Sequence, residues 1–227
     1  MVIQKLRDKF KGKEVFIVGG GPSLKNFDFE CLRDKTTISV NHSFKYVPNT
    51  NLITHLDWSF VREYGKDETF INTDKLTWSR HLKNNKHHEA KLYPRAYENT
   101  ALIHGIHYHQ QIGLSKAIDK QHPKITLHTS GQLAILFCVA AKASKVYLLG
   151  FDACEEYKEH NQFHDFHPRN KIGTPAYMKQ SVALQRMFDK FNNKEEIGHF
   201  SKNNIINLNP ESCMGVFQKM SPDFLKS

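Results

Sequence analysis

One short segment limits what this chain can fold into: the apolar run 15–18 leads directly into Gly19-Gly20-Gly21-Pro22-Ser23. Glycines let the backbone come close to a ligand, and a helix that begins at the proline would leave unpaired N–H groups aimed at the same place. Such a strand, turn and helix is typical of an anion site in an α/β sheet. The turn matches neither G-x-G-x-x-G nor the Walker A motif, so a plain structural turn explains it equally well.

Polar residues follow the next apolar segments of the chain. The β-branched run 36–40 ends at Asn41, and the apolar piece 51–56 stops at Asp57. Because the carboxyl ends of parallel strands meet at one edge of a sheet, we expect the glycine turn, Asn41 and Asp57 to share that edge.

The second half of the chain repeats this pattern. Residues 125–131 lead from an apolar run into a helix rich in small residues, and 145–152 is typical of a buried strand that ends in an acid, Asp152. A helix from about Thr174 and a last strand over 204–208 follow. We predict one α/β domain over 1–227, a Rossmann-like, doubly wound and mostly parallel sheet. Residues 58–125 are a candidate insertion, and 153–173 a candidate lid.

Composition excludes several classes of protein. The chain has 227 residues, of which 39% are hydrophobic, and no apolar run long enough to span a membrane. Its polar first residues lack a signal-peptide core, which predicts a cytoplasmic location. The four cysteines form no Cys-x-x-Cys pair, which argues against a disulfide framework or a thiolate zinc site. The net charge of +9 favours polyanionic partners, but a lysine-rich surface explains it as well.

Taken in order, the motifs resemble a known family. They are Gly19-Gly20-Gly21-Pro22-Ser23-Leu24, Val40-Asn41-His42, Thr129-Ser130-Gly131, Leu149-Gly150-Phe151-Asp152 and Asn209-Pro210-Glu211-Ser212. This series resembles the bacterial sialyltransferases of glycosyltransferase family 42. It equally resembles the broader MptE-like superfamily of bacterial and phage proteins, which includes 6-hydroxymethylpterin diphosphokinases.

The resemblance to the sialyltransferases implies a CMP-sugar donor at the carboxyl edge of a Rossmann-like sheet. Gly20 and Gly21 would approach the nucleotide, Asn41 would bind its ribose or phosphate, and the segment Thr129-Ser130-Gly131 would hold the cytidine or the sugar. The chain departs from those enzymes at Gly20, where they carry an asparagine before Gly-Pro-Ser. This difference leaves the identity of the donor open.

The same resemblance implies a lid after Asp152 that carries the reacting groups. Tyr157 and one of three histidines, His160, His164 or His167, match the phosphate-binding tyrosines and the general base of those enzymes. We favour His164, because imidazole accepts a proton near neutral pH and Asp165 is adjacent to orient it. Arg169 would meet the phosphates as they gain charge on leaving.

Other interpretations of these residues remain open. The histidines with nearby acids have spacings compatible with a divalent metal, although 14 histidines make chance clustering a serious alternative, above all for the stretch 104–109. In a diphosphokinase, Asp57 or Asp152 would hold Mg²⁺ across the phosphates of ATP. Trp58, Phe60 and Tyr157 could stack on a base, but packing explains each singly.

The sequence therefore predicts a glycosyltransferase that needs no cofactor and moves a sugar from a nucleotide-sugar donor to a hydroxyl of a glycan or of modified DNA. The candidate catalytic residues are His164, His160, His167 and Arg169. The candidate substrate-binding residues are Gly19, Gly20, Gly21, Pro22, Ser23, Asn41, Asp57, Thr129, Ser130, Gly131, Asp152 and Tyr157. The alternatives are Mg²⁺-dependent pyrophosphoryl transfer from ATP to a pterin-like alcohol, and a non-catalytic nucleotide- or nucleic-acid-binding module. Sequence does not constrain the oligomeric state.

Overall fold

A computed structural model of the protein describes residues 3–56, 58–79, 95, 99–104, 129–152 and 204–226. These residues form one eight-stranded sheet in which every pair of neighbouring strands is parallel, in the order β5-β4-β3-β2-β1-β6-β7-β8. The strands are β1 (Glu14–Val18), β2 (Thr36–Val40), β3 (Leu52–His55), β4 (Lys75–Ser79), β5 (Thr100–His104), β6 (Lys145–Leu149), β7 (Ile205–Asn207) and β8 (Gln218–Lys219). The predicted Rossmann-like α/β class is confirmed.

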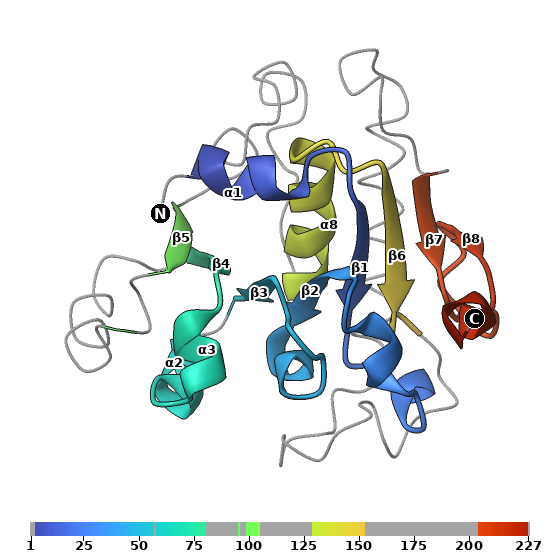
Figure 1. The fold of residues 1–227 in the computed structure, drawn as a ribbon, viewed down its shortest axis with the longest axis horizontal. Coiled ribbons are helices and arrows are strands. Elements are labelled where there is room, and N and C mark those ends of the chain that lie inside the picture. The colour runs from blue at the N-terminus through green and yellow to red at the C-terminus, as the bar shows by residue number, and fades with distance from the viewer. Residues whose placement is uncertain are drawn as a thin grey trace.

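The order of the strands places a topological switch point between β1 and β6. From β1 the chain adds β2 to β5 on one side, and it then adds β6 to β8 on the other. The arrowheads of β1, β6 and β7 point to the same edge, beside the short helical turns that follow β1 (Figure 1). In open parallel sheets, ligands bind at the carboxyl edge where the strand order reverses.

Alternation of side chains along the strands gives the sheet two buried faces. In β1, Val15 and Ile17 join a core with α1 (Ile3–Phe10) and α8 (Ser130–Ala140), whereas Phe16 and Val18 face the other side. Since successive residues of a strand point to opposite faces, an unbroken apolar run is what a doubly covered sheet requires. All eleven residues of α8 are buried, as expected for a helix that is apolar all round.

The helix expected after the glycine turn is instead two short 3-10 turns, η1 (Pro22–Leu24) and η2 (Phe29–Leu32). The hydrogen bonds from Leu24 N to Gly21 O and from Lys25 N to Pro22 O span three residues. The Asp28 side chain then accepts from Glu30 N and begins a new turn. A side chain that bonds to its own backbone competes with helix continuation.

Four elements lie in the stretch 58–125, the candidate insertion of the sequence analysis. They are α2 (Trp58–Tyr64), α3 (Glu68–Asn72), β4 and β5. β4 begins with Lys75, which is fully buried and whose Nζ donates to the carbonyls of Phe70, Ile71 and Thr73 at the end of α3. A strand that begins with a buried lysine has no clear apolar signature. The remaining elements are η3 (Asn41–Lys45) and η7 (Pro222–Lys226), and the helix expected from about 174 lies outside the described residues.

Candidate functional site

The two loops that the sequence singled out lie on the same side of the molecule, separated by one aromatic ring. A Cβ added to Gly19 would lie 3.2 Å from Phe151 Cε2, and one added to Gly131 would lie 2.9 Å from Phe151 Cε1. The exit of β1 and the first turn of α8 therefore contact opposite parts of the Phe151 ring.

The exit of β2 joins the same place through Asn41. Asn41 has a left-handed φ of 53°, which asparagine tolerates better than most residues, and its Oδ1 accepts from Ser130 Oγ at 3.0 Å. Two residues further on, Ser43 Oγ donates to Val18 O at 2.7 Å. The exits of β1 and β2 and the start of α8 thus meet at one edge of the sheet.

Hydrogen bonds within the chain occupy most N–H groups of the glycine turn. Gly19 N donates to Leu149 O at 2.7 Å, Gly21 N to Gly150 O at 2.9 Å, and Ser23 N to the Asp152 carboxylate at 2.8 Å. Gly20 N–H has no acceptor among the described residues, and Gly20 is half-buried. The sequence predicted a row of open donors, whereas among the described residues Gly20 N–H is the one donor of this turn without an acceptor.

Asp152 is the anion that the turn holds in this structure. Its side chain is buried, and Oδ1 accepts from Ser23 Oγ at 2.7 Å and from Asn209 Nδ2 at 2.8 Å, while Oδ2 accepts from Ser23 N. A Cβ on Gly21 would lie 2.5 Å from Oδ2 and 2.6 Å from Gly150 O, so the close approach of this carboxylate and of the β6 exit requires glycine there. One carboxylate therefore joins the exits of β1, β6 and β7.

The start of α8 is a complete capping box. Thr129 Oγ1 accepts from Gln132 N, and Gln132 Oε1 accepts from Thr129 N, both at 3.1 Å. The Thr129 hydroxyl keeps its own proton for donation to a ligand. The positive end of this eleven-residue helix faces the carboxyl edge of the sheet, where it favours a negative group.

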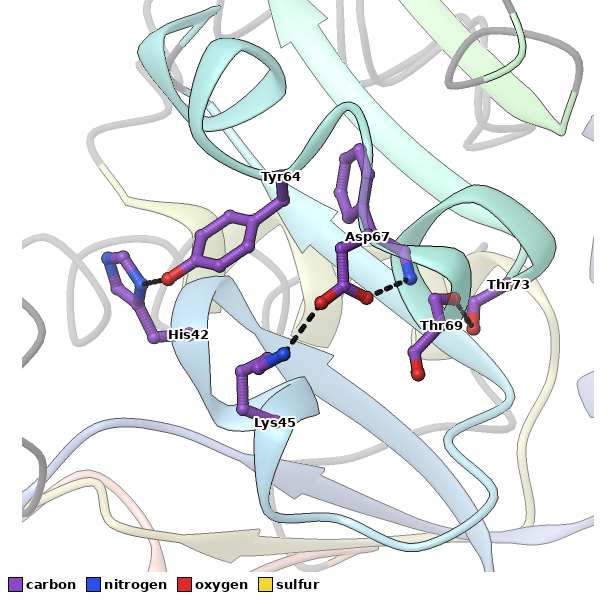
Figure 2. Close-up of polar contacts among 7 residues, drawn as sticks. His42, Lys45, Tyr64, Asp67, Thr69 and Thr73 are labelled. Atoms are coloured by element: carbon purple, nitrogen blue, oxygen red, sulfur yellow. Dashed lines mark hydrogen bonds and ion pairs between the residues drawn. The ribbon is translucent and has the colours of Figure 1, made fainter.

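A second network fixes η3, which begins at Asn41, to the helices after β3. His42 Nδ1 and the Tyr64 hydroxyl lie 2.7 Å apart, and Lys45 Nζ donates to Asp67 at 2.6 Å (Figure 2). Burial, followed by the Glu63 carboxylate, raises the pKa of Tyr64, so the phenol stays protonated. Burial would raise the pKa of Asp67, but the bonds from Lys45 and the Phe70 N–H outweigh it and lower that pKa.

Phe60 is buried and belongs to an aromatic cluster rather than to an open stacking surface. Its ring stacks on His55 at 5.2 Å between centroids and contacts Tyr64 at 4.7 Å between centroids.

Cys138 lies in the buried helix α8. Burial raises the pKa of its thiol, which makes this cysteine unreactive.

Several predicted site residues lie outside the described part of the chain. They are Asp57, Tyr157, His160, His164, His167 and Arg169. Within the described ranges, no three His, Cys, Asp or Glu side chains are grouped to hold a metal ion. No helix in those ranges is long and apolar enough to cross a membrane.

Residue-by-residue reasoning missed Phe151 and Asn209. Phe151 follows the apolar strand β6, and its side chain has no polar group that suggests a role. Asn209 was visible only as part of the terminal Asn209-Pro210-Glu211-Ser212 motif, and its partner is 57 residues away.

The fold and the convergence of strand exits define a doubly wound α/β protein with its candidate site at the topological switch point. No protein-family model matches the chain, and no curated protein sequence matches it significantly. Its fold is similar to that of the sialyltransferase CstII from Campylobacter jejuni in complex with cytidine-5'-monophosphate. The identity is 18% and the TM-score 0.55, over 94% of this chain and 86% of CstII.

Two further solved structures are similar. CstII in complex with the substrate analogue CMP-3FNeuAc is 20% identical with a TM-score of 0.54, over 92% of this chain and 86% of CstII. The monofunctional α-2,3-sialyltransferase Cst-I from Campylobacter jejuni is 17% identical with a TM-score of 0.52, over 91% of this chain and 79% of Cst-I. At these identities the likeness establishes the fold.

Proposed function

We propose that the protein is a glycosyltransferase that moves a sugar from a CMP-sugar or a similar nucleotide sugar to an acceptor hydroxyl. The observation that carries the proposal is the meeting of the glycine turn, Asn41 and the start of α8 at one edge of the sheet. Two of the similar folds hold CMP or a CMP-sugar analogue. The acceptor is a glycan or, given the net charge of +9, a modified nucleic acid.

The described residues supply the donor site. Gly20 N–H and the positive end of α8 would meet the phosphate, and Thr129 would donate to the ribose or the base. The bond between Ser130 and Asn41 orients the Asn41 amide, so that its NH₂ group remains available to the nucleotide.

The reacting groups would come from the segment after Asp152. His164 would take the proton of the acceptor hydroxyl as its oxygen bonds to the anomeric carbon of the sugar, with His160 and His167 as the alternative bases. The bond from that carbon to the phosphate oxygen breaks, and Tyr157 and Arg169 would stabilise the departing nucleotide. Orientation and charge stabilisation supply the catalysis.

One observation bears on the alternative of Mg²⁺-dependent pyrophosphoryl transfer. Both carboxylate oxygens of Asp152 already accept hydrogen bonds from Ser23 and Asn209. These bonds take up most of the acceptor capacity of a carboxylate that is buried, which disfavours Asp152 as a metal ligand and leaves Asp57 as the other candidate.

The test is a release assay with a panel of nucleotide sugars and with ATP, each with and without EDTA. We expect CMP release that EDTA leaves unchanged. Release of AMP that EDTA abolishes would instead identify a diphosphokinase, and nucleotide binding without any release would identify a binding module.

The assignment of the base is tested with His164→Ala. We expect transfer to be lost while CMP affinity stays within about threefold, because the imidazole acts on the acceptor and not on the nucleotide. His107→Ala, from the other histidine-rich stretch, is the matched control. Transfer that persists in His164→Ala would refute the assignment and direct the same test to His160 and His167.

A further inference from the structure

The Phe151 ring fills the space between the two loops that would hold the nucleotide. A Cβ added to Gly131 would lie 2.9 Å from Cε1 and 3.2 Å from Cζ of this ring, and one added to Gly19 would lie 2.7 Å from Gly150 O and 3.2 Å from Cε2 of the ring. Neither glycine has a left-handed φ. Space, and not backbone conformation, is therefore the reason for glycine at both positions.

Gly131 makes this argument strongest because it lies in the first turn of α8. Helix propensity favours alanine over glycine, so glycine there is unfavourable for the helix itself. Close contact between the Phe151 ring and the backbone of α8 accounts for the glycine at position 131.

The backbone of Phe151 is held firmly from both sides. Its carbonyl accepts from Asn207 Nδ2 at 2.9 Å and from Ser212 Oγ at 2.7 Å. Gly150, just before it, accepts from Gly21 N, and Asp152, just after it, accepts from Ser23. These bonds fix the backbone from which the ring projects, so the ring can change its place only by leaving its present rotamer.

We propose that Phe151 is a positioning residue, a rigid spacer that sets the separation between Gly19–Ser23 and Thr129–Gly131 and thereby the affinity for the nucleotide part of the donor. The inference rests on the proposed function, since it assumes that both loops contact one ligand. Hydrogen bonds to a shared ligand weaken within a few tenths of an ångström of misplacement, so the width of the spacer matters.

The test combines Gly131→Ala and Phe151→Leu in the full chain, singly and together. Leucine lacks the Cε and Cζ carbons that approach the glycines. We measure the Kd for CMP by calorimetry and, in parallel, the free energy of unfolding in urea. The matched controls are Gly215→Ala, whose new Cβ would have no atom within 4 Å, and Phe224→Leu, at an exposed phenylalanine.

We expect each single variant to weaken CMP binding about tenfold and the double variant to return to within about threefold of the wild type, because alanine fills the space that the ring leaves. The controls keep the wild-type Kd. Should Phe151→Leu fail to fold, Phe151→Met replaces it, because the flexible methionine side chain can move aside for the new Cβ of Gly131→Ala, and the same expectations apply.

Two results would overturn the spacer alone: single variants that lose stability but bind CMP as the wild type does, or a double variant whose binding loss is the sum of the two. A wild-type protein that binds no CMP would overturn the CMP-sugar as the donor of the proposed function, and the spacer role for this nucleotide with it. The wild-type measurement therefore separates the two failures.

Discussion

Replacing the Asp152 carboxylate by an amide tests the hydrogen bonds that join the exits of β1, β6 and β7 at the carboxyl edge of the sheet. Asp152→Asn changes neither size nor shape, so it creates no cavity. The carboxylate accepts from Ser23 N, Ser23 Oγ and Asn209 Nδ2 at 2.7–2.8 Å, and its side chain is 4% exposed. An amide offers one acceptor oxygen, and its NH₂ group must face either Ser23 N or Asn209 Nδ2, each of which is a donor.

The expected loss in the free energy of unfolding follows from this mismatch between two donors. A buried donor that loses its acceptor costs about 1–3 kcal/mol. We therefore expect Asp152→Asn to lower the free energy of unfolding by about 2 kcal/mol, or the Tm by roughly 4–8 °C for a chain of this size. Urea unfolding followed by circular dichroism measures the change. Asp34→Asn, the same substitution at an exposed position, is the control and should change stability little.

A second substitution checks the cause. In the double variant Asp152→Asn with Asn209→Asp, the new amide can donate to the new carboxylate, and its oxygen can still accept from Ser23 N. We expect the double variant to recover at least half of the lost stability. A loss below about 0.5 kcal/mol in Asp152→Asn, or no recovery in the double variant, would refute the hydrogen-bond argument.

Three further predictions concern η3 and α3. The pKa of Asp67 is lowered, so its stabilisation is complete above the ordinary value of 3.8 and is lost as the pH falls through the lower folded value. Lys45→Met should flatten this acid dependence of unfolding and cost about 0.5–1 kcal/mol at neutral pH, because the pair is partly exposed. Tyr64→Phe removes the hydroxyl next to His42 and should cost about 1–2 kcal/mol in urea unfolding. Lys75→Met removes a buried ammonium that donates to three carbonyls, and should cost about 3 kcal/mol in the same assay.

Each of these three predictions has a result that would contradict it. The Asp67 argument fails if Lys45→Met keeps the wild-type dependence on pH between 2 and 5, the interval that brackets the ordinary carboxyl pKa. Wild-type stability of Tyr64→Phe would show that the bond to His42 contributes nothing. Wild-type stability of Lys75→Met would show that water or backbone adjustment satisfies the carbonyls of α3.

The sequence predicted those parts of the structure that depend on neighbours along the chain. The apolar run 15–18 predicted a strand, and β1 is a strand whose side chains contribute to the core on both faces of the sheet. The segment Thr129-Ser130-Gly131 predicted a helix start, and α8 begins at Ser130 with a capping box formed by Thr129 and Gln132. Periodicity and capping act over a few residues, so one segment carries the whole signal.

Local signals failed in two places. The helix expected to begin at Pro22 breaks into two turns, and the Asp28 side chain begins the second of them. β4 begins with a lysine that only its bonds to the end of α3 make acceptable, and the propensities of the strand itself do not reveal these bonds.

Only the tertiary structure decided what the polar residues of the edge do. The sequence placed Asp152 at a strand end, but its contact with Ser23 spans 129 positions, and that contact makes the carboxylate an internal anchor of the glycine turn. The sequence likewise did not reveal that Phe151 lies against Gly19 and Gly131. A linear pattern records which residues follow each strand, whereas the pairing of strand exits depends on the order of strands in the sheet, a consequence of the whole chain packing at once.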